Sequence, residues 1–133
     1  MRYPTRYGLA GIGALALLSL VHWARGWELP TSPTTAYLLG VLPNFAAAVA
    51  ITFALLSIWS DQNSEASFAS NKRAFFAAAS ISGVGLFAWE FFQKTTSGKL
   101  VFDEHDLAAT LIGLGAASLL FYTITRRFRG EKT

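Results

Sequence analysis

Four long segments of the chain carry no charged residue, and their spacing limits the possible folds more than any other feature. They contain 18, 32, 16 and 19 residues and cover positions 7–24, 29–60, 74–89 and 107–125. A helix needs about 20 mostly apolar residues to cross a bilayer. The segments are rich in Ala and Leu and do not alternate apolar with polar residues, which argues against strands. The spacing therefore predicts four membrane-spanning helices.

We expect an all-α integral membrane protein, folded as an antiparallel four-helix transmembrane bundle in a single domain over residues 1–133. The predicted spans lie near 8–23, 36–59, 74–93 and 107–125. Composition agrees, because 53% of the residues are hydrophobic and only 14% are charged, whereas about a quarter of a soluble domain is charged. A chain of 133 residues is too small to bury that much apolar surface in one aqueous core.

The first span begins with basic residues, as a secretory signal peptide does. Its end, residues 21–25, lacks the small-x-small pattern of a cleavage site. We therefore expect a retained helix.

Lys and Arg residues are unevenly divided between the two sides of the predicted bundle. Eight of the 11 fall on the side that holds both termini and the middle loop, and three fall on the other, at Arg25, Lys94 and Lys99. Short cytoplasmic loops carry an excess of these residues, so we expect cytoplasmic N- and C-termini. The basic tail 126–129 then lies beside anionic lipid head groups and lacks an aromatic RNA-binding motif. We expect membrane lipids, and no nucleic acid, as partners.

Two further patterns belong to the spans themselves. Aromatic residues suited to the membrane interface lie near the predicted helix ends, at Tyr3, Tyr7, Trp23, Trp27, Tyr37, Trp59, Trp89 and Tyr122. Small residues recur at four-residue spacing, at Ala46, Ala50 and Ala54, at Ala79 and Gly83, and at Gly113 and Ala117. Such stripes let helices approach closely. They fit a compact bundle and equally a contact with a partner subunit.

Polar residues gather on the outer side of the predicted bundle. The antiparallel order brings to that side His22, Asn44, Glu90, Gln93 and the run Asp103-Glu104-His105-Asp106. Ionisable groups at membrane depth are costly and usually face the bundle interior or a wet cavity. Glu90 and Gln93 are three residues apart and share a helix face, as do Asp103 and Asp106.

Each of these residues also has a purely structural interpretation. Asp103 fits the N-cap of the fourth helix, with Asp106 at its third position. Asn44 follows Pro43 and can satisfy backbone groups that the proline frees. Glu90 can be a solvated helix end, although Phe91 and Phe92 continue the apolar stretch. His22 and His105 fit interfacial and exposed loop positions better than ligand positions.

The same cluster allows two kinds of chemistry. Glu90, Asp103 and Asp106, with His105, contain ligands suited to a divalent metal, but no compact metal-binding motif is present. A proton-transfer role would pair Glu90 near the apolar boundary with loop aspartates. The absence of cysteine excludes thiolate chemistry, and no phosphate-binding glycine loop is present, so we expect no cofactor. Whether the chain is an enzyme stays open.

Residues 89–113 resemble the VanZ-like family of small polytopic bacterial membrane proteins. The matching pattern is Glu-x-x-Gln, a Gly-Lys loop, Phe-Asp-x-x-Asp and a glycine in the last helix, at Glu90, Gln93, Gly98, Lys99, Phe102, Asp103, Asp106 and Gly113. Lys99 stands where the family commonly has Arg, and Thr110 stands where it has Asn. Residues 42–45, Leu-Pro-Asn-Phe, replace an Asp-Lys-x-x-His-Phe motif.

The resemblance implies an envelope role at the outer face of a bacterial inner (cytoplasmic) membrane. We expect an outward-facing acidic pocket for a polar head group, a cell-wall precursor or a cation. Its expected key groups are Glu90 and Asp106, with Gln93, Asp103 and Asn44 orienting them and Lys99 contacting an anionic group.

Two alternatives remain open. In the first, the chain is a non-catalytic accessory or structural subunit of a larger bacterial membrane complex. The second is an ion pathway, which the absence of acidic residues from the inner halves of the spans disfavours.

Overall fold

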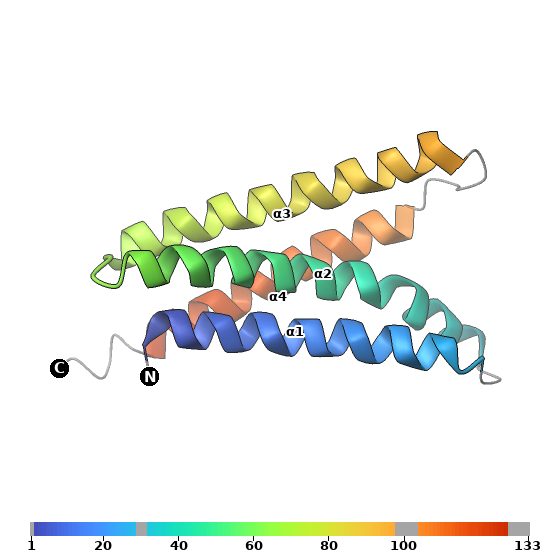
Figure 1. Ribbon diagram of the computed structural model, residues 1–133, viewed down its shortest axis with the longest axis horizontal. Coiled ribbons are helices and arrows are strands. Elements are labelled where there is room, and N and C mark those ends of the chain that lie inside the picture. The colour runs from blue at the N-terminus through green and yellow to red at the C-terminus, as the bar shows by residue number, and fades with distance from the viewer. Residues whose placement is uncertain (1, 29–31, 98–103, 128–133) are drawn as a thin grey trace.

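The computed structural model describes residues 2–28, 32–97 and 104–127. They form four long helices packed antiparallel, in the order α1 (Tyr3–Gly26), α2 (Pro33–Gln62), α3 (Phe68–Ser97) and α4 (Glu104–Arg127) (Figure 1). The predicted all-α bundle is confirmed. Each helix contains one predicted span and extends beyond it at both ends, since the helical hydrogen bonding does not stop where the apolar residues do.

Local sequence explains where the helices begin. Ser32 caps α2, with its hydroxyl oxygen accepting a hydrogen bond of 3.3 Å from the Thr35 amide, and Pro33 occupies the first helical position. Ser67 does the same for α3, accepting from the Ser70 amide at 3.2 Å. Serine at this position satisfies amide groups that have no partner inside the helix.

All four helices are long and apolar enough to cross a membrane, with candidate spans of 24, 30, 26 and 23 residues. Large apolar side chains cover their outer faces, and Leu119, Val84 and Ile112 are 72%, 68% and 65% exposed. An apolar surface of this extent is a liability in water, whereas in a bilayer it contacts lipid chains. The chain is therefore a four-span membrane protein.

The central helix of the bundle is α2. It packs against each of the other three helices, and α1 and α3 lie on its opposite sides without touching in the described part of the chain (Figure 1). Small buried residues, Ala46, Ala48 and Ala50, give α2 a narrow surface on which neighbours can pack closely. The predicted close-packing role is confirmed for Ala46 and Ala50, whereas Ala54 is exposed.

One end of the bundle is closed by aromatic rings. Each helix contributes one fully buried ring, Tyr7, Phe53, Phe75 and Phe121. The Phe75 and Phe121 rings stack with centroids 4.5 Å apart, and the Tyr7 ring lies 6.1 Å from both Phe53 and Phe121. Such ring pairs add stability beyond the area they bury. We call this the closed end; here α1 and α3 begin and α2 and α4 end.

The expectation that Tyr7 anchors the membrane interface is wrong. Its side chain is completely buried, and its hydroxyl group forms a hydrogen bond of 3.0 Å with the Thr125 hydroxyl on α4. This buried partner satisfies the phenol inside the bundle, where an unpaired hydroxyl would be costly.

The opposite end is splayed, and we call it the open end. No residue of α2 before Ala46 is buried, and none of α3 between Val84 and Gln93. Figure 1 shows the first third of α2 bending toward α1 while α3 diverges from it. Pro43 lies inside α2, where proline removes a backbone hydrogen bond and bends the helix. The bend therefore separates α2 from α3 at this end.

Candidate functional site

A hydrogen bond joins α2 and α3 at the base of the open end. The Asn44 amide nitrogen donates to the Glu90 carboxylate oxygen Oε1 at 3.3 Å, and both side chains are half-buried. The residues are 46 positions apart, so only the antiparallel packing brings them together. Asn44 follows Pro43 directly, which places it where α2 and α3 begin to diverge.

A second polar pair joins α2 and α4 at the same end. The Tyr37 hydroxyl and His105 Nδ1 are 2.9 Å apart, and the two rings meet edge to face at 5.3 Å. We expected His105 in an exposed loop, but it lies in the first turn of α4. The sequence predicts only an anchoring role for Tyr37; its spacing of seven residues from Asn44, two helical turns, places both residues on one face of α2.

Carboxylates occupy the first turn of α4. Glu104 and Asp106 lie there, where free amide groups and the positive end of the helix favour negative charge. The Asp106 backbone carbonyl accepts a hydrogen bond of 3.0 Å from the buried Thr110 hydroxyl. Gln93 lies on α3 one turn beyond Glu90 and is half-buried. Two of the predicted site residues, Lys99 and Asp103, lie outside the described residues.

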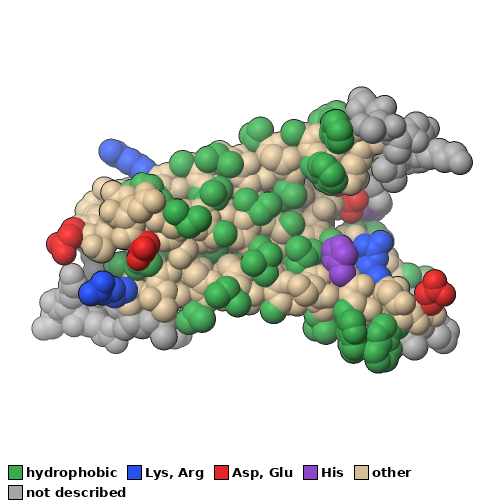
Figure 2. Space-filling model, in the orientation of Figure 1, with side chains coloured by type: hydrophobic (Ala, Val, Ile, Leu, Met, Phe, Trp, Pro, Cys, Tyr) green, Lys and Arg blue, Asp and Glu red, His purple; other side chains and the backbone are tan. Residues whose placement is uncertain are grey.

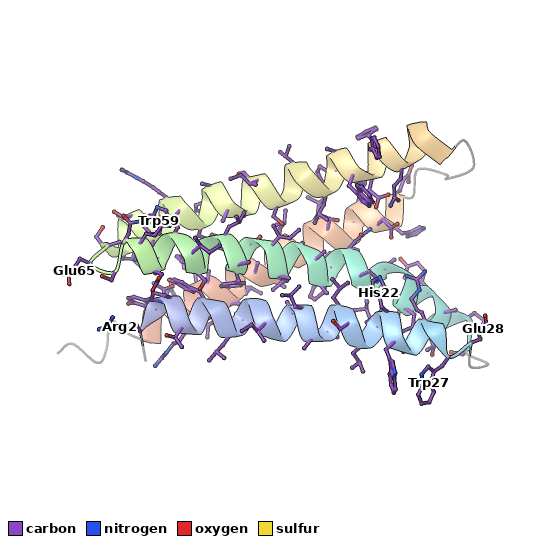
Figure 3. The ribbon with its side chains drawn as sticks, in the orientation of Figure 1. Arg2, His22, Trp27, Glu28, Trp59 and Glu65 are labelled. Carbon is purple, nitrogen blue, oxygen red and sulfur yellow. The ribbon has the colours of Figure 1, made fainter. Side chains whose placement is uncertain are left out.

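The end of α1 completes this side of the molecule. Figure 3 places His22, Trp27 and Glu28 at the open end and Arg2, Trp59 and Glu65 at the closed end. His22 Nδ1 lies 3.0 Å from the Leu18 carbonyl oxygen. A carbonyl only accepts, so Nδ1 carries the proton of this bond. In the space-filling view the open end has a notch between α1 and α3, with acidic, basic and histidine side chains beside it (Figure 2).

The described groups suit hydrogen bonding more than metal coordination. Among the residues that the structure describes, no three His, Asp or Glu side chains lie close enough to hold a metal ion. A metal centre that includes Asp103 stays a prediction. The carboxylate, amide, phenol and imidazole groups can together donate and accept several hydrogen bonds at one membrane face.

The fold and this cluster define a class: a four-span membrane protein with polar side chains gathered at one splayed end of its bundle. No protein-family model, no curated protein and no solved structure matches the chain. The resemblance to the VanZ-like family therefore stays a prediction.

Proposed function

We propose that the chain is a VanZ-like protein of a bacterial inner membrane that binds a polar head group of the cell envelope at its open end. The observation that carries the proposal is the hydrogen bond between Asn44 and Glu90. Two residues from distant parts of the sequence meet where the helices separate. A carboxylate and an amide at membrane depth are expensive and mark functional sites.

The cluster is suited to a ligand rich in hydrogen-bond donors. The Glu90 carboxylate accepts hydrogen bonds, and the Asn44 amide can both donate and accept. Tyr37 and His105 lie at the same end as a second bonded pair, and Asp106 adds a further carboxylate nearby in the first turn of α4. Hydrogen bonds to a charged acceptor are about twice as strong as neutral ones. A head group with hydroxyl or ammonium groups fits this chemistry.

The unequal division of basic residues supports the orientation. Arg2, Arg6, Lys72, Arg73 and Arg126 belong to the closed end, which the positive-inside rule assigns to the cytoplasm. The open end then faces the cell wall, where envelope lipids and cell-wall precursors present their head groups.

The test replaces Glu90 and Asp106 with their amides, Glu90→Gln and Asp106→Asn, in a strain whose resistance to a cell-wall antibiotic depends on this chain. Each substitution keeps the size of the side chain and removes its charge. We expect both to abolish resistance while membrane levels of the protein stay unchanged. Glu65→Gln, at the closed end, is the matched control and should retain resistance. Wild-type resistance in both variants would overturn the proposal.

A further inference from the structure

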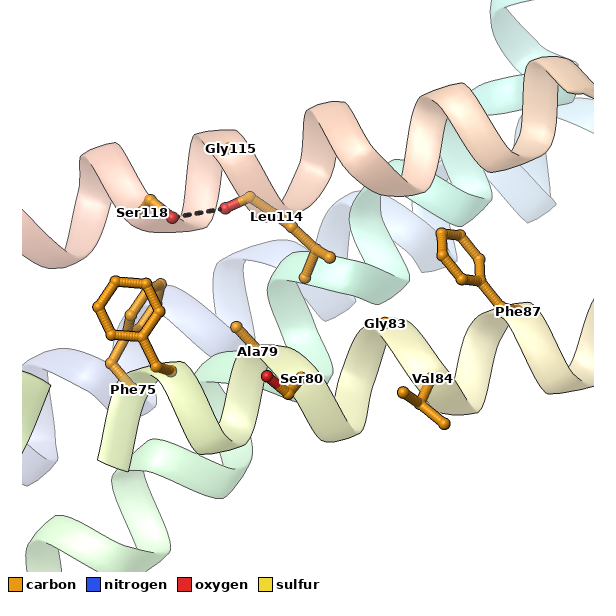
Figure 4. Close-up of a pocket in the computed structure, with 10 residues that line it drawn as sticks. Phe75, Ala79, Ser80, Gly83, Val84, Phe87, Leu114, Gly115 and Ser118 are labelled. Carbon is orange, nitrogen blue, oxygen red and sulfur yellow. Dashed lines mark hydrogen bonds between the residues drawn. The ribbon is translucent and has the colours of Figure 1, made fainter. Parts of the chain in front are cut away.

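A groove opens on the membrane-facing side of the bundle, between α3 and α4. Its volume is about 410 Å³, and its walls are mainly apolar (Figure 4). It follows α3 from Phe75 to Phe87 and is bounded on α4 by Leu114, Gly115 and Ser118. The hydroxyl of Ser118 donates to the Leu114 carbonyl at 2.9 Å. The Ser118 hydroxyl is thus bonded within its own helix, and Ser80 on α3 is the other hydroxyl of the lining (Figure 4).

Small residues create this groove. Gly83 on α3 and Gly115 on α4 both line it. A Cβ added at Gly115 would find no atom within 4 Å. The two helices meet at the closed end, where Phe75 stacks on Phe121, and again further along, where a Cβ added at Gly83 would lie 3.1 Å from the Leu114 side chain. Gly115 therefore leaves unfilled space on the α4 side of the groove.

The groove leads toward the polar pair of the open end. Gly83, Phe87 and Glu90 follow one another on α3 at spacings of four and three residues, which place them on one helix face. Gly83 and Phe87 line the groove, and Glu90 holds the hydrogen bond to Asn44. One face of α3 thus runs from an apolar channel to a carboxylate.

The length of the groove favours an extended chain as the occupant. Phe75 to Phe87 spans about 18 Å at 1.5 Å per residue, a length that an extended acyl chain can follow along α3. The lining includes the exposed side chains of Phe76 and Val84, and the surrounding bilayer supplies hydrocarbon chains to them.

We infer that the α3–α4 groove holds the hydrocarbon chain of an amphiphile whose head group lies at Glu90. This inference rests on the proposed function and names the class of ligand, a membrane lipid bound by both its tail and its head group. The tail gains contacts with Phe76, Val84 and Phe87, and the Glu90 carboxylate selects a head group that donates hydrogen bonds.

The test uses the full chain in vesicles of phosphatidylethanolamine that carries a photoactivatable diazirine midway along one acyl chain. After illumination, mass spectrometry maps the labelled residues. The exposed face of α1, with Leu9, Ile12 and Leu15, measures ordinary lipid contact. We expect the groove-lining residues of α3 and α4 to be labelled more strongly than this reference face.

Two leucine variants make the test specific. Gly115→Leu places a side chain in the groove without a clash at Cβ, and should reduce groove labelling to the level of the α1 face. Gly85→Leu is the matched control, because an added Cβ there also meets nothing within 4 Å and Gly85 does not line the groove. Its labelling should equal that of the wild type.

Three results would overturn the inference: no enrichment in the wild type, enrichment that survives Gly115→Leu, or a groove protected by a second copy or another subunit. Glu90→Gln separates this inference from the proposed function. Enriched groove labelling that is independent of the head group and of Glu90 would show that a tail enters the groove, but it would overturn the placement of the head group at Glu90 and with it the proposed function. Head-group binding that depends on Glu90 without groove enrichment contradicts the groove inference alone.

Discussion

At the scale of single residues, Gly113 on α4 packs directly against the backbone of α2. A Cβ at this position would lie 2.6 Å from the Phe45 carbonyl oxygen and 2.9 Å from the Ala48 Cβ on α2. Both atoms are held by the α2 backbone, so no flexible side chain can move aside. The predicted role of Gly113 in close helix packing is confirmed, and glycine is required because any larger residue meets backbone.

We expect Gly113→Ala to destabilise the bundle. Overpacking of a tight interface costs about 1–3 kcal/mol, and the higher helix propensity of alanine returns up to about 1 kcal/mol. Gly115→Ala, two residues further along α4, is the control: nothing lies within 4 Å of its new Cβ, so its stability should equal or exceed that of the wild type. Reversible unfolding in mixed detergent micelles, followed by circular dichroism, measures both. Equal stability of Gly113→Ala and Gly115→Ala would contradict the close contact of Gly113 with α2.

Individual residues also show where prediction from sequence stops. Asn44 and Glu90 could be placed at the same end because antiparallel order alone brings them there. The bond between Tyr7 and Thr125 spans 118 positions and depends on which faces of α1 and α4 meet. Residue types and their spacing do not reveal that pairing of faces. Tyr7 and Tyr37 both lie near helix ends, and only the packing shows that the first is buried and the second bonded to His105.

At the scale of elements, the bend of α2 at Pro43 opens the site. The part of α2 before Pro43 carries Tyr37, which reaches His105 on α4, and the residue after it reaches Glu90 on α3. Beyond the bend, α2 is bound to α3 by the Ser82 hydroxyl, which donates to the Ala48 carbonyl at 3.2 Å. The part of α2 after Pro43 is therefore fixed inside the bundle, whereas the direction of its first third depends on this one proline.

Pro43→Ala should straighten α2 and separate Tyr37 from His105. The chain contains no cysteine, so the pair Tyr37→Cys and His105→Cys can report on this distance without background. We expect rapid cross-linking of this pair by a short bifunctional thiol reagent with Pro43 present, and much slower cross-linking in the Pro43→Ala background. A control pair, Tyr7→Cys and Thr125→Cys at the closed end, should cross-link equally in both. Identical rates for the first pair would show that proline does not set the bend.

The four spans could be predicted from sequence because each helix must by itself keep charged residues out of the bilayer core, so each span is visible as one uncharged segment. The α3–α4 groove could not. Its existence depends on how side chains of α3 and α4 pack against each other, and the residues that line it, among them Gly83 and Gly115, lie on different spans. The close approach predicted for Gly83 is confirmed, because a Cβ added there would lie 3.1 Å from the Leu114 side chain on α4; Ala79 and Gly83 also line the groove.

At the scale of the whole molecule, the account predicts one orientation in the membrane. Glu28→Cys lies at the open end and Ser64→Cys in the turn between α2 and α3 at the closed end, and both positions are exposed. With cytoplasmic termini, a thiol reagent that cannot cross membranes should label Glu28→Cys in intact cells and Ser64→Cys only after lysis. The reverse pattern would place the open end in the cytoplasm.

Binding of a head group through Glu90 is the central claim, and competition between two lipids tests it most directly. Phosphatidylethanolamine has an ammonium group with N–H donors, and phosphatidylcholine with the same acyl chains has none. A hydrogen bond to a charged group contributes about 1.5–3 kcal/mol, which corresponds to a preference of about tenfold or more in Kd. Native mass spectrometry of the purified chain counts the bound lipids. We predict this preference in the wild type and in Glu28→Gln, and its loss in Glu90→Gln; equal binding of both lipids by the wild type would contradict the claim.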